Sequence, residues 1–515
     1  MTPPSAAPGT TAGTTAITTA ETGVLRLAAA RTLTCADVEA VSRGDGSPRV
    51  AFAAEAIAAM HASRGALHEA IDAGEEVYGL TTGFGPLVQY AADSNACAQG
   101  TGLIAHLGAG WGPLASPEIV RATLLCRANT LAQGMSGINP AVAEGFLALL
   151  NHNVLPAIPE VGSVGASGDL IPLAHAARVL TGEGHVLSPG SATIDAADAL
   201  AIAGMSPVDL PGRDALALVN GTSFMTAYAA IACARAERLL ARAETLTGWL
   251  YRALGARLPA LDDRLHAARG HVGQRVSAAN IRREALAEGD VQDEGRPLQE
   301  VYSVRCTPQF LGAARDQLEH ARALVECELN GVNDNPVVAS GAVLHGGNFQ
   351  GQQIAFASDT INTALVHAGI VAERQLDVLC NPDLNGGAPL LLASEPGATS
   401  GMAGAQITAT AVIAEMRHHA TPSTIASIPT NGRNQDVVSM GTLAARAALG
   451  QTGRLGAVLG VLAIALDQLA HLRNGGRAPG RVAARPAARP AYTPFDRDRA
   501  LHSDLARISA GLLAP

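Results

Sequence analysis

The sequence predicts an all-α protein built around a bundle of long helices. Of its 515 residues 48% are apolar but only 3% are aromatic, so the core must consist mainly of Ala, Leu, Val and Ile, which favours closely packed helices over strands. Beyond residue 214 the apolar residues recur at helical spacing over long stretches. The chain is too long for one ordinary compact core and predicts two or three structural units.

The predicted units follow the changes in composition along the chain. Residues 1–22 are rich in Thr, Ala, Pro and Gly and lack the basic start and apolar block of a signal peptide, which predicts a disordered tail. Residues 23–213 mix short helical patterns with Gly and Pro turns and form the predicted N-terminal domain. Residues 214–515 form the predicted long-helix domain, which ends in a C-terminal loop and helix. Its arginines from Arg473 to Arg489 are interrupted by Gly and Pro, which predicts a solvated loop of unassigned role.

The long helices are separated by polar loops. Helices are predicted over residues 223–258, 312–329, 351–379, 400–419 and 439–472, the last of them broken around residues 450–453. Loops dense in Asn, Gln and Gly lie at the helix ends: Asn220–Ser223, Asn333–Pro336, Gly346–Phe349 and Asn434–Asp436. One such loop is explained by helix capping, whereas four in one chain predict polar groups gathered at a site.

The composition excludes several classes of protein. All 36 basic residues are arginine, so the chain has neither the Schiff-base lysine of a pyridoxal-phosphate enzyme nor the phosphate-binding lysine of a P-loop. A net charge of −9 argues against nucleic-acid binding. The seven cysteines form no Cys-x-x-Cys pair and no metal-ligand spacing is present, which predicts reduced thiols, a cytoplasmic location and no metal. The longest apolar run is about 12 residues, too short for the roughly 20 of a membrane span.

The tripeptide Ala166-Ser167-Gly168 is the most informative motif. It lies in a glycine-rich stretch, residues 162–170, where the backbone can bend tightly. If the nitrogen of Gly168 attacks the carbonyl of Ala166, whose oxygen leaves as water, and Ser167 loses a second water, the product is a five-membered ring with an exocyclic methylene. This ring, a 4-methylidene-imidazol-5-one (MIO), is an electrophile made from the chain itself. The alternative for the tripeptide alone is a Gly/Ser turn before a helix that begins near Asp169.

Two further motifs suit the removal of ammonia from an α-amino acid. Such a reaction needs an electrophile for the amine, a base for the weakly acidic β-proton and a clamp for the carboxylate. Tyr78 lies in a loop with Gly79, Gly83 and Gly85 and is the candidate base, provided that the site lowers its pKa from about 10. Arg305, with Tyr302 nearby, is the candidate carboxylate clamp.

Together these motifs resemble the MIO family of histidine, phenylalanine and tyrosine ammonia-lyases and related aminomutases. The resemblance covers residues 33–472 and includes the segments 77–85, 162–170, 215–223, 302–311, 328–336, 344–352 and 434–440. It implies the all-helical, aspartase/fumarase-like fold, an N-terminal domain that carries the MIO, and a homotetramer whose sites are completed by several subunits. It also implies that the MIO forms autocatalytically, with Ala166 and Gly168 cross-linked.

The resemblance also assigns roles to individual residues. It implies that Tyr78, Tyr302 and the MIO residues are catalytic. Asn220 would contact the ring or the substrate amine, and Asn335 would support the substrate carboxylate beside Arg305. Gln435 would line the site, and Phe349 would pack near the ring.

The pair His106-Leu107 predicts the substrate. Histidine-specific members usually carry Ser-His here and a glutamate in place of Gln435, phenylalanine-specific members usually carry an apolar pair, and His-Leu is typical of tyrosine ammonia-lyases. An imidazole can bind a phenol, and Leu107 can pack on the ring. Trp111 is bulkier than the residue common in the family at its position and departs from this pattern.

The leading hypothesis is therefore a tyrosine ammonia-lyase that makes trans-p-coumarate, a phenylpropanoid. The alternatives are a tyrosine 2,3-aminomutase that makes β-tyrosine and a lyase of mixed tyrosine, phenylalanine and dihydroxyphenylalanine specificity. A helical scaffold that has lost activity would show damage at Tyr78, Ser167 or Arg305, and all three are intact.

Overall fold

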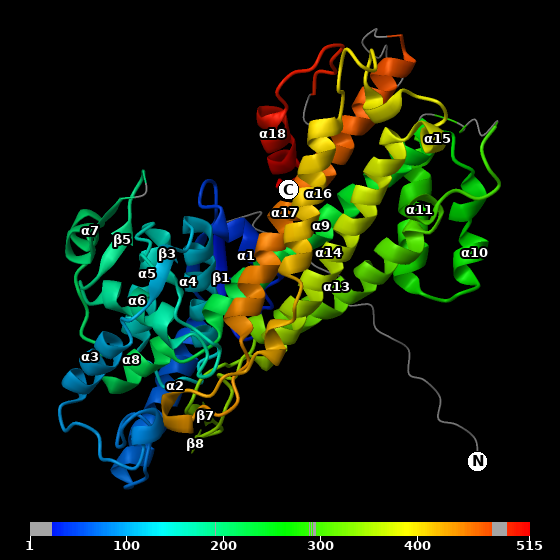
Figure 1. Cartoon of the computed structure of the whole chain (residues 1–515). Coiled ribbons are helices and arrows are strands. Elements are labelled where there is room, and N and C mark those ends of the chain that lie inside the picture. The colour runs from blue at the N-terminus through cyan, green and yellow to red at the C-terminus, as the bar shows by residue number, and fades with distance from the viewer. Residues whose placement is uncertain (1–22, 191, 288, 290, 292–294, 476–491) are drawn as a thin grey trace, which may run out of the picture.

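The protein, seen here in a computed structural model, is a mostly helical molecule with a long central bundle (Figure 1). The structure describes residues 23–190, 192–287, 289, 291, 295–475 and 492–515. The tail predicted for residues 1–22 and most of the arginine-rich segment lie outside the described residues. The prediction of an all-α fold built on long helices is confirmed.

The bundle is formed by helices that pack along much of their length. Its longest members are α9 (Ser223–Leu254), α13 (Thr307–Leu329), α14 (Gln352–Cys380), α16 (Ala403–His418) and α17 (Gly441–Arg473). α17 packs against both α14 and α9, and α13 packs against α14. At about 1.5 Å per residue, α9 is about 48 Å long. The bundle therefore has two widely separated ends.

Other helices, most of them shorter, surround this bundle. Those before it are α1 (Cys35–Ser42), α2 (Ala54–Asp72), α3 (Ala96–His106), α4 (Pro117–Ala132), α5 (Pro140–Asn151), α6 (Leu170–Leu180), α7 (Ala196–Ile202) and α8 (Gly212–Val219). Those between or after the long helices are α10 (Asp263–Ala267), α11 (Val272–Ala285), α12 (Tyr302–Arg305), α15 (Pro382–Asn385) and α18 (His502–Leu513). In Figure 1, α2, α3 and α8 lie toward one end of the bundle, and α10, α11 and α15 toward the other.

Among the described residues the strands pair into two-stranded sheets. β1 (Val24–Leu27) and β2 (Arg49–Phe52) are parallel, with Val24 opposite Arg49. The antiparallel pairs are β3 (Trp111–Leu114) with β4 (Pro159–Val161), β5 (His185–Leu187) with β6 (Thr193–Asp195), and β7 (Val337–Ala339) with β8 (Ala342–Leu344). The β7–β8 hairpin packs against α2 at the end of the bundle where α2, α3 and α8 lie (Figure 1).

The core is continuous from the N-terminal elements into the bundle. Buried side chains of α4, α5 and α6 belong to the same apolar cluster as those of α9, α14 and α17. The predicted domain boundary between residues 213 and 214 falls inside α8, and the division into two domains stays a prediction. The apolar windows of α14 and α17 are long enough to cross a membrane by composition, but 72% and 78% of their residues are buried inside the molecule.

The predicted break in the last long helix is wrong. α17 runs unbroken from Gly441 to Arg473, through Gly450 and Gly453. Between these glycines Gln451 is buried, and its Nε2 donates to Asn362 Oδ1 at 2.9 Å and to Met416 O at 3.0 Å. These contacts to neighbouring helices hold the helix through a segment whose own propensity is weak.

Candidate active site

The Ala166-Ser167-Gly168 turn lies where the N-termini of several helices meet. Asp169 directly precedes α6, and its carboxylate accepts from Met225 N–H in the first turn of α9 at 2.8 Å. Thr442, in the first turn of α17, donates to the same carboxylate at 2.6 Å. Gly351, which precedes α14, donates to Gly165 O at 3.4 Å. The partial positive charges of these helix ends therefore surround the turn and favour electron-rich groups there.

The backbone of this turn requires glycine at two positions. Gly165 and Gly168 have φ angles of +70° and +68°, which side chains rarely adopt. A Cβ at Gly168 would lie 2.1 Å from Gly221 O, and one at Gly165 would lie 2.3 Å from Ser439 Oγ. The tight packing on both sides of Ser167 fits the bend that ring closure needs.

Asp169 and Ser163 stabilise the turn by hydrogen bonds. Its buried carboxylate also accepts from Ser163 Oγ at 2.8 Å, and Ser163 Oγ accepts from Gly165 N–H at 3.1 Å. Burial raises the pKa of Asp169 to about 6, against the opposing effect of these hydrogen bonds. The sequence interpretation gave Asp169 no role, although it directly follows the tripeptide.

Two amides contact the turn from other segments. Gln435 Nε2 donates to Ser167 Oγ at 2.8 Å, and Asn220 Nδ2 donates to Ser167 O at 3.1 Å. Among the described residues Asn220 Oδ1 is buried without a hydrogen-bond partner, and such an acceptor suits an ammonium group. Asn220 and Gln435 therefore both contact Ser167, and the residues present fit an MIO and an amino substrate.

Tyr78 lies in a loop that reaches the same end of the bundle. Its OH accepts from Gly85 N–H at 2.7 Å, and its ring meets Phe84 edge-on with centroids 6.3 Å apart. The loop packs against the segment that contains Gln435: Asn431 Nδ2 would lie 3.1 Å from a Cβ at Gly85, and Gln435 in turn contacts Ser167. Burial raises the pKa of Tyr78, and the Gly85 hydrogen bond only partly opposes this. The expectation that the surroundings lower this pKa is therefore wrong for the single chain.

His106 and Leu107 lie at the C-terminal end of α3. His106 is exposed and its Nδ1 lies 2.9 Å from Gly102 O, whereas Leu107 is buried. The following loop is held by α6, because Gly110 N–H donates to His175 Nε2 at 3.3 Å. Burial lowers the pKa of His175, which favours the neutral, accepting ring. A Cβ at Gly162 would lie 3.5 Å from Gly110 Cα, so the loop that follows His106 packs against the start of the glycine-rich stretch that carries the turn.

Asn335 and Phe349 flank the β7–β8 hairpin. Asn335 Oδ1 accepts from Gly346 N–H at 2.8 Å. The preceding Asp334 is buried against two arginines: Arg213 Nη2 donates to it at 2.5 Å and Arg127 Nη2 lies 3.6 Å away. Phe349 is half-buried, two residues before Gly351, which contacts the turn. Arg127 is a buried charge within the mostly apolar helix α4. A charged residue among apolar ones in a helix indicates a buried ion pair, and sequence analysis missed this signal.

Tyr302 and Arg305 lie at the opposite end of the bundle. They form α12, where the Arg305 guanidinium lies 4.8 Å from the centroid of the Tyr302 ring. Tyr251 OH donates to Val304 O at 3.1 Å, and Tyr251 lies 28 residues beyond Ser223 along α9, about 42 Å at 1.5 Å per residue. Asn335 and Arg305 of one chain are held apart by α13, so the expectation that both hold one substrate carboxylate stays a prediction that requires residues of different chains.

Two buried polar atoms at α12 and the start of α13 have no hydrogen-bond partner among the described residues. Arg305 Nε is buried without a hydrogen-bond partner, and so is Gln309 Oε1 one turn later. Tyr302 is 65% exposed. An unsatisfied guanidinium beside an exposed tyrosine fits a group that meets its ligand outside its own chain.

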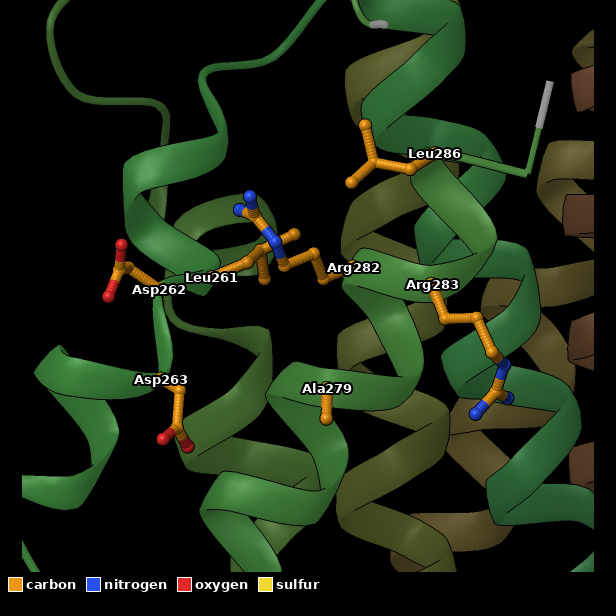
Figure 2. Close-up of a pocket in the computed structure, with 7 residues that line it drawn as sticks. All are labelled: Leu261, Asp262, Asp263, Ala279, Arg282, Arg283 and Leu286. Carbon is orange, nitrogen blue, oxygen red and sulfur yellow. The ribbon is translucent and has the colours of Figure 1, made fainter. Parts of the chain in front are cut away.

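Other surface features lie away from this chemistry. A pocket between α10 and α11 is lined by Leu261, Asp262, Asp263, Ala279, Arg282, Arg283 and Leu286 (Figure 2). Its two aspartates already pair with Arg264 at 2.9 Å and Arg275 at 3.0 Å. Among the described residues no group of three or more His, Cys, Asp or Glu side chains is placed to hold a metal.

Comparison of the sequence and the fold with known proteins identifies the family. The profile of the aromatic amino acid lyases matches residues 33–490, and the chain belongs to this family. It is 40% identical to the tyrosine ammonia-lyase of Cereibacter sphaeroides, over 91% of this chain and 94% of that protein. It is 41% identical to the histidine ammonia-lyase of Geobacillus thermodenitrificans, over 77% and 79%. The crystal structure of the tyrosine aminomutase of Streptomyces globisporus superposes with a TM-score of 0.87 at 36% identity, over 95% and 97% of the two chains.

Proposed function

We propose that this lyase removes ammonia from L-tyrosine to give trans-p-coumarate, with an MIO formed autocatalytically from Ala166, Ser167 and Gly168. The observation that carries the proposal is that Asn220 and Gln435, from different segments, both contact Ser167 in the Ala-Ser-Gly turn. The loops that carry Tyr78 and His106 pack against segments next to this turn. High identity to two tyrosine ammonia-lyases, from Cereibacter sphaeroides and Cupriavidus metallidurans, supports the choice of substrate.

Each residue has a defined task in this reaction. The MIO supplies an electrophile that turns the amino group into a better leaving group. Asn220 Oδ1 accepts from the ammonium group, and Tyr78, as phenolate, takes the β-proton. Gly85 N–H favours that phenolate by donating to its oxygen. Asn335 Nδ2 and Arg305 hold the carboxylate, His106 binds the phenol OH, and Leu107 packs on the ring.

We further propose that the active form is a homotetramer in the cytoplasm. One chain holds the turn at one end of the bundle and Arg305 at the other, so a complete site requires a second copy. Large apolar side chains exposed on or near the long helices, including Phe356, Ile407 and Leu443, provide contact surface for it. The seven free cysteines support a reducing compartment.

A tyrosine 2,3-aminomutase is the second candidate, favoured by the likeness to the Streptomyces globisporus enzyme. A histidine ammonia-lyase is as similar in identity, at 41%, but over a smaller share of this chain, and His106-Leu107 and Gln435 favour a phenolic substrate over histidine. The test is incubation of the purified enzyme with tyrosine, phenylalanine, histidine and dihydroxyphenylalanine, with every product identified. The proposal requires p-coumarate from tyrosine as the main product at the highest kcat/KM. A main product of β-tyrosine or urocanate would replace it with the aminomutase or the histidine lyase.

A further inference from the structure

The β7–β8 hairpin supports the loop that carries Tyr78. Val338 of β7 is buried in one apolar cluster with Leu67 of α2 and Val77, which precedes Tyr78. Leu80 and Val343 pack against the same cluster. The base of the Tyr78 loop therefore rests on this hairpin by apolar contact.

The neck of the hairpin is fixed by polar contacts. On the entry strand, Arg213 donates to Asp334 Oδ2, to Asn335 O and to Pro336 O at 2.5, 3.3 and 3.3 Å. On the exit strand, Gly346 N–H donates to Asn335 Oδ1 at 2.8 Å. Buried charge-assisted hydrogen bonds of this kind leave the neck little freedom.

His345 lies at this neck, between β8 and Gly346. Its Nε2 accepts a hydrogen bond from the backbone N–H of Tyr78 at 3.1 Å. An accepting Nε2 places the ring proton on Nδ1. His345 is thus hydrogen-bonded to the main chain of Tyr78, and the next residue, Gly346, is hydrogen-bonded to the side chain of Asn335.

We propose that His345 is a positioning residue that fixes Tyr78 relative to Asn335, and thereby the base relative to the substrate carboxylate. The inference rests on the proposed function, in which Tyr78 takes the β-proton and Asn335 holds the carboxylate. The distance between these two groups decides whether the phenolate reaches the β-carbon of a substrate held by its carboxylate. His345 sets that distance through the Tyr78 backbone and takes no part in the proton transfer.

The test uses three substitutions of one side chain. The amide oxygen of glutamine can reach the place of Nε2, that of asparagine is too short, and alanine has no acceptor. His345→Ala and His345→Asn should lower kcat by about three- to tenfold, the range of one net hydrogen bond, with KM within about twofold. His345→Gln should restore most of kcat. The kinetic isotope effect with β-deuterated tyrosine should rise in the alanine variant, because proton removal becomes slower.

Amide exchange tests the same contact without any substrate. The peptide spanning residues 77–92 should exchange faster in His345→Ala than in the wild type, and His345→Gln should restore its protection. His61→Ala is the matched control, because His61 is an exposed histidine on α2, which packs against the same hairpin. It should leave kcat, the isotope effect and exchange unchanged.

The outcomes separate this inference from the proposed function. If His345→Ala keeps wild-type exchange and kcat, or if glutamine fares no better than alanine, His345 does not position Tyr78. If amide exchange follows the expected order but the wild-type enzyme does not act on tyrosine, His345 does position the Tyr78 backbone and the proposed substrate is wrong. If His345→Ala and His345→Gln lowered the thermal unfolding midpoint equally, the effect would come from lost stability, and the positioning role of the hydrogen bond would be rejected.

Discussion

The two ends of the helix bundle differ in how completely their polar groups are satisfied. At one end Ser167 is contacted by Asn220 and Gln435, and Asp169 ties the turn to α9 and α17. At the other end Arg305 stacks on an exposed Tyr302 with its Nε unpaired. The first end is built to shape an electrophile, whereas the second is built to reach outward. The difference supports the proposed tetramer, in which the bundle acts as a spacer: it holds two halves of a site about 42 Å apart along α9, and each half would complete a site with a different copy.

The largest effect should come from Ser167, which supplies the methylene of the ring. In the wild type, the mass of the peptide over residues 162–175 should be lower by two waters. Ser167→Ala should abolish that loss, remove the near-ultraviolet absorbance of the ring, and lower turnover by more than a lost base would. Tetramer formation should persist, because the far end is unchanged. Full activity with an unmodified wild-type peptide would refute ring formation.

Tyr78→Phe should have the next largest effect. Removing a positioned base costs roughly 10²–10⁴-fold in turnover, and the ring and the tetramer should remain intact. Because burial raises the pKa of Tyr78 and the base acts deprotonated, wild-type kcat should rise with pH on the alkaline side. The residual activity of Tyr78→Phe should lose that rise. A variant with near-normal turnover would require another base at this end.

His106→Phe should have a smaller effect, on selectivity. Without the imidazole, tyrosine loses a hydrogen bond to its phenol, and phenylalanine no longer leaves that imidazole unpaired. The ratio of kcat/KM for tyrosine to that for phenylalanine should fall by about tenfold, since one net hydrogen bond is worth about 0.5–1.5 kcal/mol. A ratio equal to that of the wild type would show that His106 does not select the substrate. Trp111, which is 76% exposed beside the same loop, or Gln435 would then be the residue to test.

The sequence predicts the long helices well because each one carries a sustained apolar period. The predicted segments 223–258 and 351–379 match α9 and α14 within a few residues at each end. The prediction fails at Gly450 and Gly453, where contacts of α17 with other helices outweigh local propensity. The two-stranded sheets were not predicted, because strands of three or four residues are too short to establish an alternating pattern.

The candidate site could be predicted only in part. The Ala-Ser-Gly turn and the polar loops stand out locally, and the structure brings Asn220, Gln435, Asn335 and Phe349 to the end that holds the turn. The separation of Arg305 from Asn335 was readable, since the predicted helix 312–329 lies between them and must hold them apart. The contacts of His345 with Tyr78 and of Arg127 with Asp334 join residues more than 200 positions apart, and no local pattern reveals such pairs.

Complementation between two inactive variants tests the shared site most directly. Ser167→Ala removes the electrophile and Arg305→Ala removes the clamp, so each homotetramer should be nearly inactive. Co-expression of the two with different tags, followed by tandem purification, isolates mixed tetramers. If each site takes Ser167 and Arg305 from different chains, about a quarter of the sites in a random mixture hold both intact groups, and activity should return to about that fraction. Mixed tetramers as inactive as the parents would contradict the account, because both groups would then act from one chain.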